Sequence, residues 1–308
     1  MSAASPTEGR RGDDRARRVP FALGAAIASI SFAAIFIRLA SPTHPLIVAG
    51  GRLAIAALLL AVPTVRGWRA GRLPPRVLTR AALCGLLYAL HFGTWVTSLS
   101  LTSVASSVTL VTATPLLLAL LSFATGKDRP EGRHWLSIGL AVVGLTLIGW
   151  ADLSFGAEAL LGDALAFAGA AAMAFYLLVV RGLGEDLDVL AFGGVATLVG
   201  AAVLVLAALA AGVPLAFASL ESAGWVALAA LVPQLVGHNL LTWALRHATP
   251  TAVGIATVGE PVGATLLAWI WLGEPLDTLV GLGCAVTLIA VLLSLRIPRS
   301  PDGDPRPV

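Results

Sequence analysis

Residues 190–212 read LAFGGVATLVGAAVLVLAALAAG and contain no charged side chain. Because about 20 predominantly apolar residues suffice for a helix to cross a bilayer, this stretch predicts a transmembrane helix. Nine similar runs lie near residues 19–37, 45–65, 81–99, 104–124, 134–151, 162–180, 225–245, 252–272 and 279–296. Of the 308 residues, 57% are hydrophobic and 12% are charged, against about 25% charged in soluble domains. The sequence therefore predicts an all-α membrane protein with ten transmembrane helices and no folded domain outside the membrane.

The basic residues lie on alternate connections between these runs. Of the 20 arginines and lysines, 18 lie in the N-terminal tail (1–18), in every second loop, or at the C-terminal end, in Arg296 and the tail 297–308. Arg38 ends the first span, and Arg52 lies within the second. Positively charged loops stay in the cytoplasm, so we expect both termini to be cytoplasmic in a multi-pass protein of the bacterial inner membrane.

The two halves of the chain resemble each other. His91 and His238 are separated by an offset of 147, as are Ala105 and Ala252. Each half holds five predicted spans, an odd number, so the second half enters the membrane in the opposite orientation. We therefore expect two inverted repeats, residues 19–151 and 152–296, with a site near the midplane where they meet.

Several short motifs fall at matching places in these repeats. They are Thr114-Pro115 and residues 126–130 in the first half, and Gly162-Asp163, Glu260-Pro261 and Gly273-Glu274 in the second. In this arrangement the chain resembles the EamA family of the drug/metabolite transporter superfamily. The resemblance implies a secondary transporter, often a metabolite or amino-acid exporter, with spans 1–4 and 6–9 around a central cavity and spans 5 and 10 outside it. The first half lacks a carboxylate before Pro115, so any role of Glu260 is not duplicated.

Apart from Asp163, which opens the sixth predicted span, Glu260 is the only carboxylate within a predicted span. It lies roughly 13 Å deep, close to the centre of a hydrocarbon core about 30 Å thick. Pro261 has no backbone N–H, which leaves the carbonyl of Thr257 without its helical partner. Glu260 is either a proton-coupling or substrate-binding carboxylate, or a neutral or paired side chain that satisfies the opened backbone.

The two histidines also lie near the midplane, and the repeat places them on opposite walls of one cavity. Neighbours at helical spacing share their faces. The predicted lining is Tyr88, His91, Trp95, Gln234, His238 and Glu260. Such a lining suits small amphipathic or aromatic solutes and also cations. The alternative is that each histidine only donates a hydrogen bond to a neighbouring helix.

Two further predictions concern the mouth of the cavity and its motion. Arg52, nearer the outer mouth, either holds an anionic group or, as we prefer, joins the outer ends of two helices through Glu274. Pro115 and Pro261 are predicted to be matched kinks that let spans 4 and 9 bend during gating.

The sequence contains no phosphate-binding loop, no metal-ligand spacing and no nucleophile motif. We therefore expect no enzyme activity, cofactor, metal or nucleic-acid partner, and a driving force taken from a gradient. The predicted function is export of small metabolites such as amino acids by alternating access, with protons as the candidate coupling ion and a monomer as the working unit. The alternatives are an exporter of cationic drugs and a membrane interaction or sensor protein that does not transport.

Overall fold

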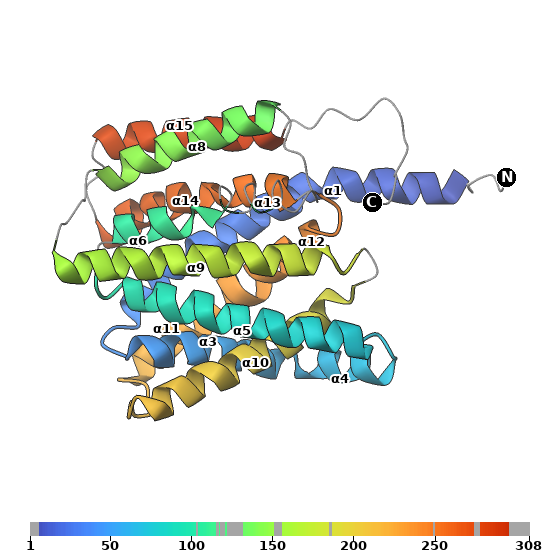
Figure 1. Ribbon diagram of the computed structural model, residues 1–308, viewed down its shortest axis with the longest axis horizontal. Coiled ribbons are helices and arrows are strands. Elements are labelled where there is room, and N and C mark those ends of the chain that lie inside the picture. Colours follow the sequence, from blue (N-terminus) through green and yellow to red (C-terminus); the bar gives the residue numbers. More distant parts are fainter. Residues whose placement is uncertain are drawn as a thin grey trace.

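The computed structural model describes residues 6–102, 104–114, 117, 121, 132–150, 156–184, 187–248, 250–273 and 278–295, and every regular element in them is a helix. The helices of the first half are α1 (Pro6–Ser31), α2 (Ala33–Leu39), α3 (Pro45–Leu59), α4 (Ala61–Arg69), α5 (Pro75–Ser98), α6 (Val104–Val111) and α8 (Gly132–Trp150). Those of the second half are α9 (Ala157–Arg181), α10 (Val189–Ala210), α11 (Leu220–Ala229), η1 (Ala230–His238), α12 (Asn239–Ala244), α13 (Pro250–Thr257), α14 (Gly259–Leu267), η2 (Ala268–Leu272) and α15 (Thr278–Leu295). Most of them run along one common direction (Figure 1).

Six segments of the described chain are long and apolar enough to cross a membrane. They are Arg18–Leu39, Pro75–Ser98, Ala157–Arg181, Val189–Ala210, Leu220–Ala244 and Val253–Trp271. The pair α3 and α4, bent by 53°, is a seventh if both helices form one span. Shorter apolar stretches lie in α8 and α15, at Trp135–Leu147 and Gly281–Ala290. The predicted fourth span, 104–124, falls partly outside the described residues, so the count of ten spans stays a prediction.

Several of these segments are interrupted near the middle of the bundle. Helix α1 gives way to α2 at Phe32, α3 to α4 at Leu60, and α13 to α14 at Val258. The π-helix η1 contains Pro233 and ends at His238. Proline removes a backbone donor, and single-turn π segments often occur at functional sites. The interruptions therefore place irregular backbone beside two of the predicted site residues, His238 and Glu260.

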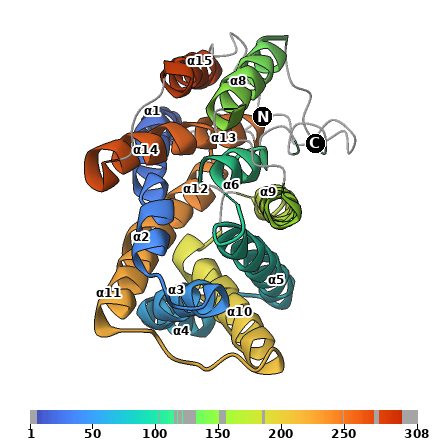
Figure 2. The same ribbon diagram turned by 90° about the vertical axis from the view of Figure 1, so that its left-hand side faces the viewer.

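Helices α8 and α15 pack side by side at one edge of the bundle (Figure 2). A Cβ atom on Gly144 would lie 2.8 Å from the carbonyl oxygen of Gly283 and 2.9 Å from the backbone nitrogen of Thr287. Gly144 thus lets the two backbones approach closely, whereas a Cβ on Gly139 would meet nothing within 4 Å. The pair occupies the outer position that the family resemblance implies for spans 5 and 10.

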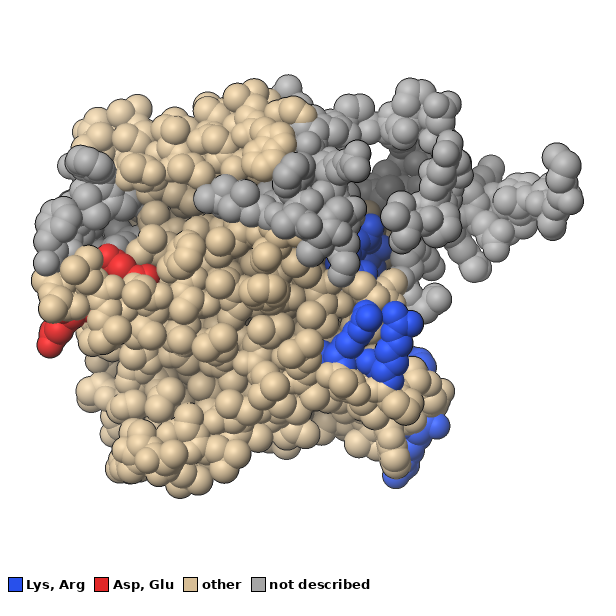
Figure 3. All heavy atoms as spheres, viewed as in Figure 1, with Lys and Arg blue, Asp and Glu red and all other residues tan. Residues whose placement is uncertain are grey.

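The two ends of the bundle differ in charge. Helix α9 has Glu158 in its first turn and Arg181 in its last. At the basic end, Arg80 Nη1 donates to the carbonyl oxygen of Gly182 at 2.6 Å. Figure 3 shows arginines at one end of the visible face and acidic side chains at the other. The acidic and basic ends are therefore separated by the length of the helices.

Candidate functional site

A cavity of about 40 Å³ lies between helices of both halves. It is lined by Ile30, Ala33, Arg52, His91, Trp95, Val111, Thr112, Thr114, Met173, Leu177, His238, Leu241, Thr257 and Glu260. Sites for small molecules usually measure about 300–1,000 Å³, whereas a single water needs only about 10–15 Å³ of such volume. In this conformation the cavity has room for water and is closed to a metabolite.

Five of the seven residues predicted to line the cavity border it. They are Arg52, His91, Trp95, His238 and Glu260. The other two, Tyr88 and Gln234, are buried but do not reach the cavity surface. Pro261 is buried in the first turn of α14, and Pro115 lies outside the described residues.

The repeat-related histidines meet at the cavity wall. The ring centroids of His91 and His238 are 6.4 Å apart, with the ring planes near perpendicular. Phe92 contacts both rings edge to face, at 4.5 Å from His91 and 5.3 Å from His238. His91 Nδ1 lies 2.9 Å from the carbonyl oxygen of Gly169, where it donates if it carries the proton. That bond fixes the His91 ring against α9. His91 therefore packs against a neighbouring helix and also borders the cavity.

Arg52 is fully buried against the cavity. Its guanidinium carbon lies 4.2 Å from the centroid of the Phe92 ring. Nε, Nη1 and Nη2 make no hydrogen bond to the described residues, and no ion pair joins Arg52 to Glu260, although both border the cavity. A desolvated cation–π contact stabilises by about 2 kcal/mol, less than several unsatisfied donors cost. Glu274, the partner that we expected for Arg52, lies outside the described residues.

Glu260 enters the cavity from the second residue of α14, just after the interruption at Val258. Its backbone carbonyl accepts a hydrogen bond of 3.4 Å from Ser31 Oγ on α1. Thr257, the last residue of α13, also borders the cavity, and its hydroxyl donates to the carbonyl oxygen of Gly254 at 2.6 Å. The helix interruption that we expected next to Glu260-Pro261 therefore lies beside the cavity that the Glu260 side chain borders.

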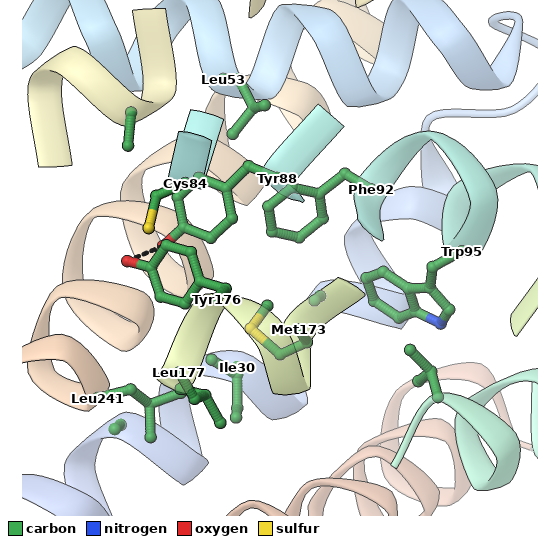
Figure 4. Packing of buried hydrophobic residues seen from close by; sticks show 14 of the residues in the cluster. Ile30, Leu53, Cys84, Tyr88, Phe92, Trp95, Met173, Tyr176, Leu177 and Leu241 are labelled. Atoms are coloured by element: carbon green, nitrogen blue, oxygen red, sulfur yellow. Dashed lines mark hydrogen bonds between the residues drawn. The ribbon is translucent and has the colours of Figure 1, made fainter. Parts of the chain in front are cut away.

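A buried chain of hydroxyl groups stands behind the cavity. Tyr88 Oη donates to Tyr176 Oη at 2.9 Å, and Tyr176 Oη lies 2.9 Å from Thr242 Oγ1. The two tyrosine rings stack with centroids 4.4 Å apart (Figure 4). Since the whole sequence has only two tyrosines, both in apolar runs, their pairing was a usable signal that sequence reasoning missed. Met173 and Leu177 of α9 were also missed.

The family was tested by comparison with known proteins. The model of the EamA-like transporter family matches residues 19–150 and 160–296. The chain belongs to this family. A solved structure, described only as the crystal structure of a protein, is 17% identical to this EamA-like chain, with a TM-score of 0.75 over 90% of this chain and 96% of its own. That likeness shows the fold alone, and no curated protein matches.

The two segments matched by the EamA family model both contribute to the cavity. Arg52, His91 and Trp95 belong to the first segment, and His238 and Glu260 belong to the second. The family is one of transporters, which fits the prediction that this chain has no enzyme activity. The cavity is thus built from both EamA-like segments, with one ionisable side chain of opposite type, Arg52 or Glu260, from each.

Proposed function

We propose that this protein is a secondary transporter that exports small metabolites such as amino acids by alternating access through the central cavity. The observation that carries the proposal is the polar lining contributed by both EamA-like segments. Polar groups inside a membrane are costly and usually mark the path of a substrate or ion. The full architecture that we propose is ten spans in two inverted repeats of five.

The proposed orientation places both termini in the cytoplasm of a bacterial cell. The separation of charge along α9, from Glu158 to Arg181, supports it, because arginines and lysines favour the cytoplasmic side. The basic ends of α4 and α9, with Arg69 and Arg181, then face the cytoplasm. We propose the inner membrane as the location and a monomer as the working unit.

We propose protons as the coupling ion and Glu260 as the group that carries them. Its position at the cavity, beside an interrupted helix, allows the carboxylate to face either side as the cavity opens. A carboxylate that gains and loses a proton during the cycle links solute movement to the proton gradient. Pro261 keeps the first turn of α14 free to bend and is the proposed gating kink of the second repeat.

The test is flux through the purified full-length protein in liposomes. Labelled amino acids and cationic dyes are supplied with and without a pH gradient. We expect saturable amino-acid flux that the gradient stimulates in the wild type and in Glu158→Gln, an exposed carboxylate far from the cavity. We expect Glu260→Gln to lose the stimulation.

Each other result has a distinct meaning. Flux of Glu260→Gln that still responds to pH as the wild type does would remove Glu260 from coupling. Dye flux without amino-acid flux would favour a drug exporter, which the aromatic side chains of Phe92 and Trp95 suit. No saturable flux of any solute would contradict transport and favour an interaction or sensor protein.

A further inference from the structure

We propose that Arg52 is the carboxylate-binding subsite of the cavity, and that the solute is a small carboxylate with an apolar body. The inference rests on the proposed transport function and narrows its substrate class. It starts from the state of the guanidinium group. Arg52 is fully buried, and its three nitrogen atoms have no hydrogen-bond partner among the described residues.

Other arginines of the same chain show how a structural arginine behaves. Arg80 donates to the carbonyl oxygen of Gly182 at 2.6 Å, and Arg181 donates to that of Leu245 at 3.0 Å. Both bonds tie the ends of helices together. Arg52 makes no such bond in the described part of the chain, although it is more deeply buried than either. Hydrogen bonds between helices of the described part of the chain therefore do not account for its position.

The contact with Phe92 decides how a ligand can reach the guanidinium group. The ring covers one face of the group, with its centroid 4.2 Å from the guanidinium carbon. The N–H donors point outward in the guanidinium plane, so stacking on a ring leaves them available. A planar carboxylate accepts two parallel N–H bonds from this edge, and such charge-assisted bonds are among the strongest in proteins. In this conformation the three nitrogen atoms are covered by protein, so the proposed bidentate contact forms when the cavity opens around that edge.

Glu260 extends the argument to the rest of the solute. It borders the same cavity and interacts electrostatically with Arg52 without forming an ion pair with it. Its carboxylate, when ionised, is complementary to an ammonium group. Ile30, Leu177 and Leu241 supply apolar surface between helices α1, α9 and α12. A solute with a carboxylate, an adjacent ammonium group and an apolar side chain is complementary to all three features. Apolar amino acids fit this description.

The experiment uses probes that differ in one group each. Leucine carries both charges, 4-methylpentanoate keeps only the carboxylate, and leucinamide keeps only the ammonium group; phenylalanine and phenylalaninamide repeat the comparison with a larger body. Binding to the purified full-length protein is measured by thermal shift, and uptake into liposomes is measured by competition with the labelled amino acid. For the wild type we expect the carboxylates to bind at least tenfold more tightly than the amides.

Variants of Arg52 then test the residue itself. We expect Arg52→Gln to weaken binding of the carboxylates at least about thirtyfold and to leave binding of the amides nearly unchanged. Arg52→Lys, which keeps the charge but loses the planar fork, should recover part of the affinity. Arg76→Gln, an exposed arginine at the start of α5, is the matched control and should behave as the wild type. Elution of each variant as a monodisperse peak shows that it is folded.

Three results would overturn the proposal while leaving transport intact. The first is equal binding of carboxylates and amides by the wild type. The second is preferential transport of cationic dyes. The third is unchanged leucine affinity in a folded Arg52→Gln. If none of the probes is bound or transported, the proposed function fails, and this inference fails with it.

Discussion

Replacing Arg52 with methionine should stabilise the protein while it abolishes transport. The guanidinium group is fully buried, and three of its atoms lack a hydrogen bond to the described residues. Each unsatisfied buried donor costs about 1–3 kcal/mol, and the contact with Phe92 returns about 2 kcal/mol. Methionine is unbranched, apolar and adaptable, so it can follow the same path beside the cavity without a charge.

The magnitude follows from these terms. Three unsatisfied donors at about 1 kcal/mol each, less about 2 kcal/mol for the lost cation–π contact, raise the free energy of unfolding by about 1 kcal/mol. The replacement of buried ionic groups by apolar ones in other proteins sets an upper value of about 4 kcal/mol. At about 2 °C per kcal/mol for a chain of this size, the apparent melting temperature should rise by roughly 2–8 °C. Arg52→Lys keeps a buried charge and should bring no such rise.

The chain provides its own reporter for the measurement. Cys84 and Cys284 are its only cysteines, and both are free and buried. A thiol-reactive dye therefore fluoresces as the protein unfolds in detergent, and the midpoint gives the apparent melting temperature. A fall of several degrees in Arg52→Met would refute the reasoning, because it would show that the folded protein satisfies the guanidinium group. An equal rise in Arg52→Lys would attribute the gain to something other than the charge.

Three further predictions use the same protein. Gly144→Ala should lower the free energy of unfolding by about 1–3 kcal/mol in the dye assay, because the added Cβ pushes α8 away from α15. Gly139→Ala, with open space around its Cβ, should be neutral or slightly stabilising. Equal effects of the two substitutions would contradict the close approach at Gly144. Tyr176→Phe should cost about 1–3 kcal/mol, because it leaves the hydroxyl of Tyr88 without its acceptor, and an unchanged melting temperature would exclude this. Pro261→Ala should slow flux more than it lowers expression, and equal losses would argue against gating.

The sequence was sufficient for the membrane class, the family and most helix positions. It was not sufficient for the interruption at Phe32, whereas Pro63, which has no N–H to bond the carbonyl oxygen of Leu59, marks the interruption at Leu60 and was a usable signal that was missed. Near both, a hydroxyl bonds to the carbonyl oxygen four residues earlier: Ser31 to Ile27 at 2.8 Å and Thr64 to Leu60 at 2.7 Å. Such bonds bend helices, but serine and threonine make them in many straight helices too. The interruption at Phe32 therefore depends on the packing around it, which one sequence does not contain.

The same limit applies to the candidate site. The repeat offset was enough to predict that His91 and His238 lie together, because matched positions of two repeats converge on one axis. Arg52 was expected near the outer mouth, yet its long side chain lies against Phe92 at the cavity. Where a flexible arginine points is decided by which neighbour covers it. Met173 was missed because the small-residue pattern of α9 does not distinguish the face toward the cavity from the face toward other helices.

The surroundings of the cavity indicate one route by which it could open. A second hollow of about 580 Å³ lies at the ends of α2, α3 and α5, lined in part by Ile37, Arg38, Val48, Val96 and Leu99. Three residues that line this hollow lie four positions along their helices from residues that line the central cavity. The pairs are Ile37 with Ala33, Val48 with Arg52, and Leu99 with Trp95. Four residues of helix advance about 6 Å, so one helical turn separates the hollow from the cavity on all three helices.

This hollow lies beside the loop that follows Arg38, which the proposed orientation places outside the cell. A shift of the Trp95 side chain and the turn around it would connect the two spaces. The proposed export cycle includes an opening to this side, which the conformation reaches by a movement of about one helical turn.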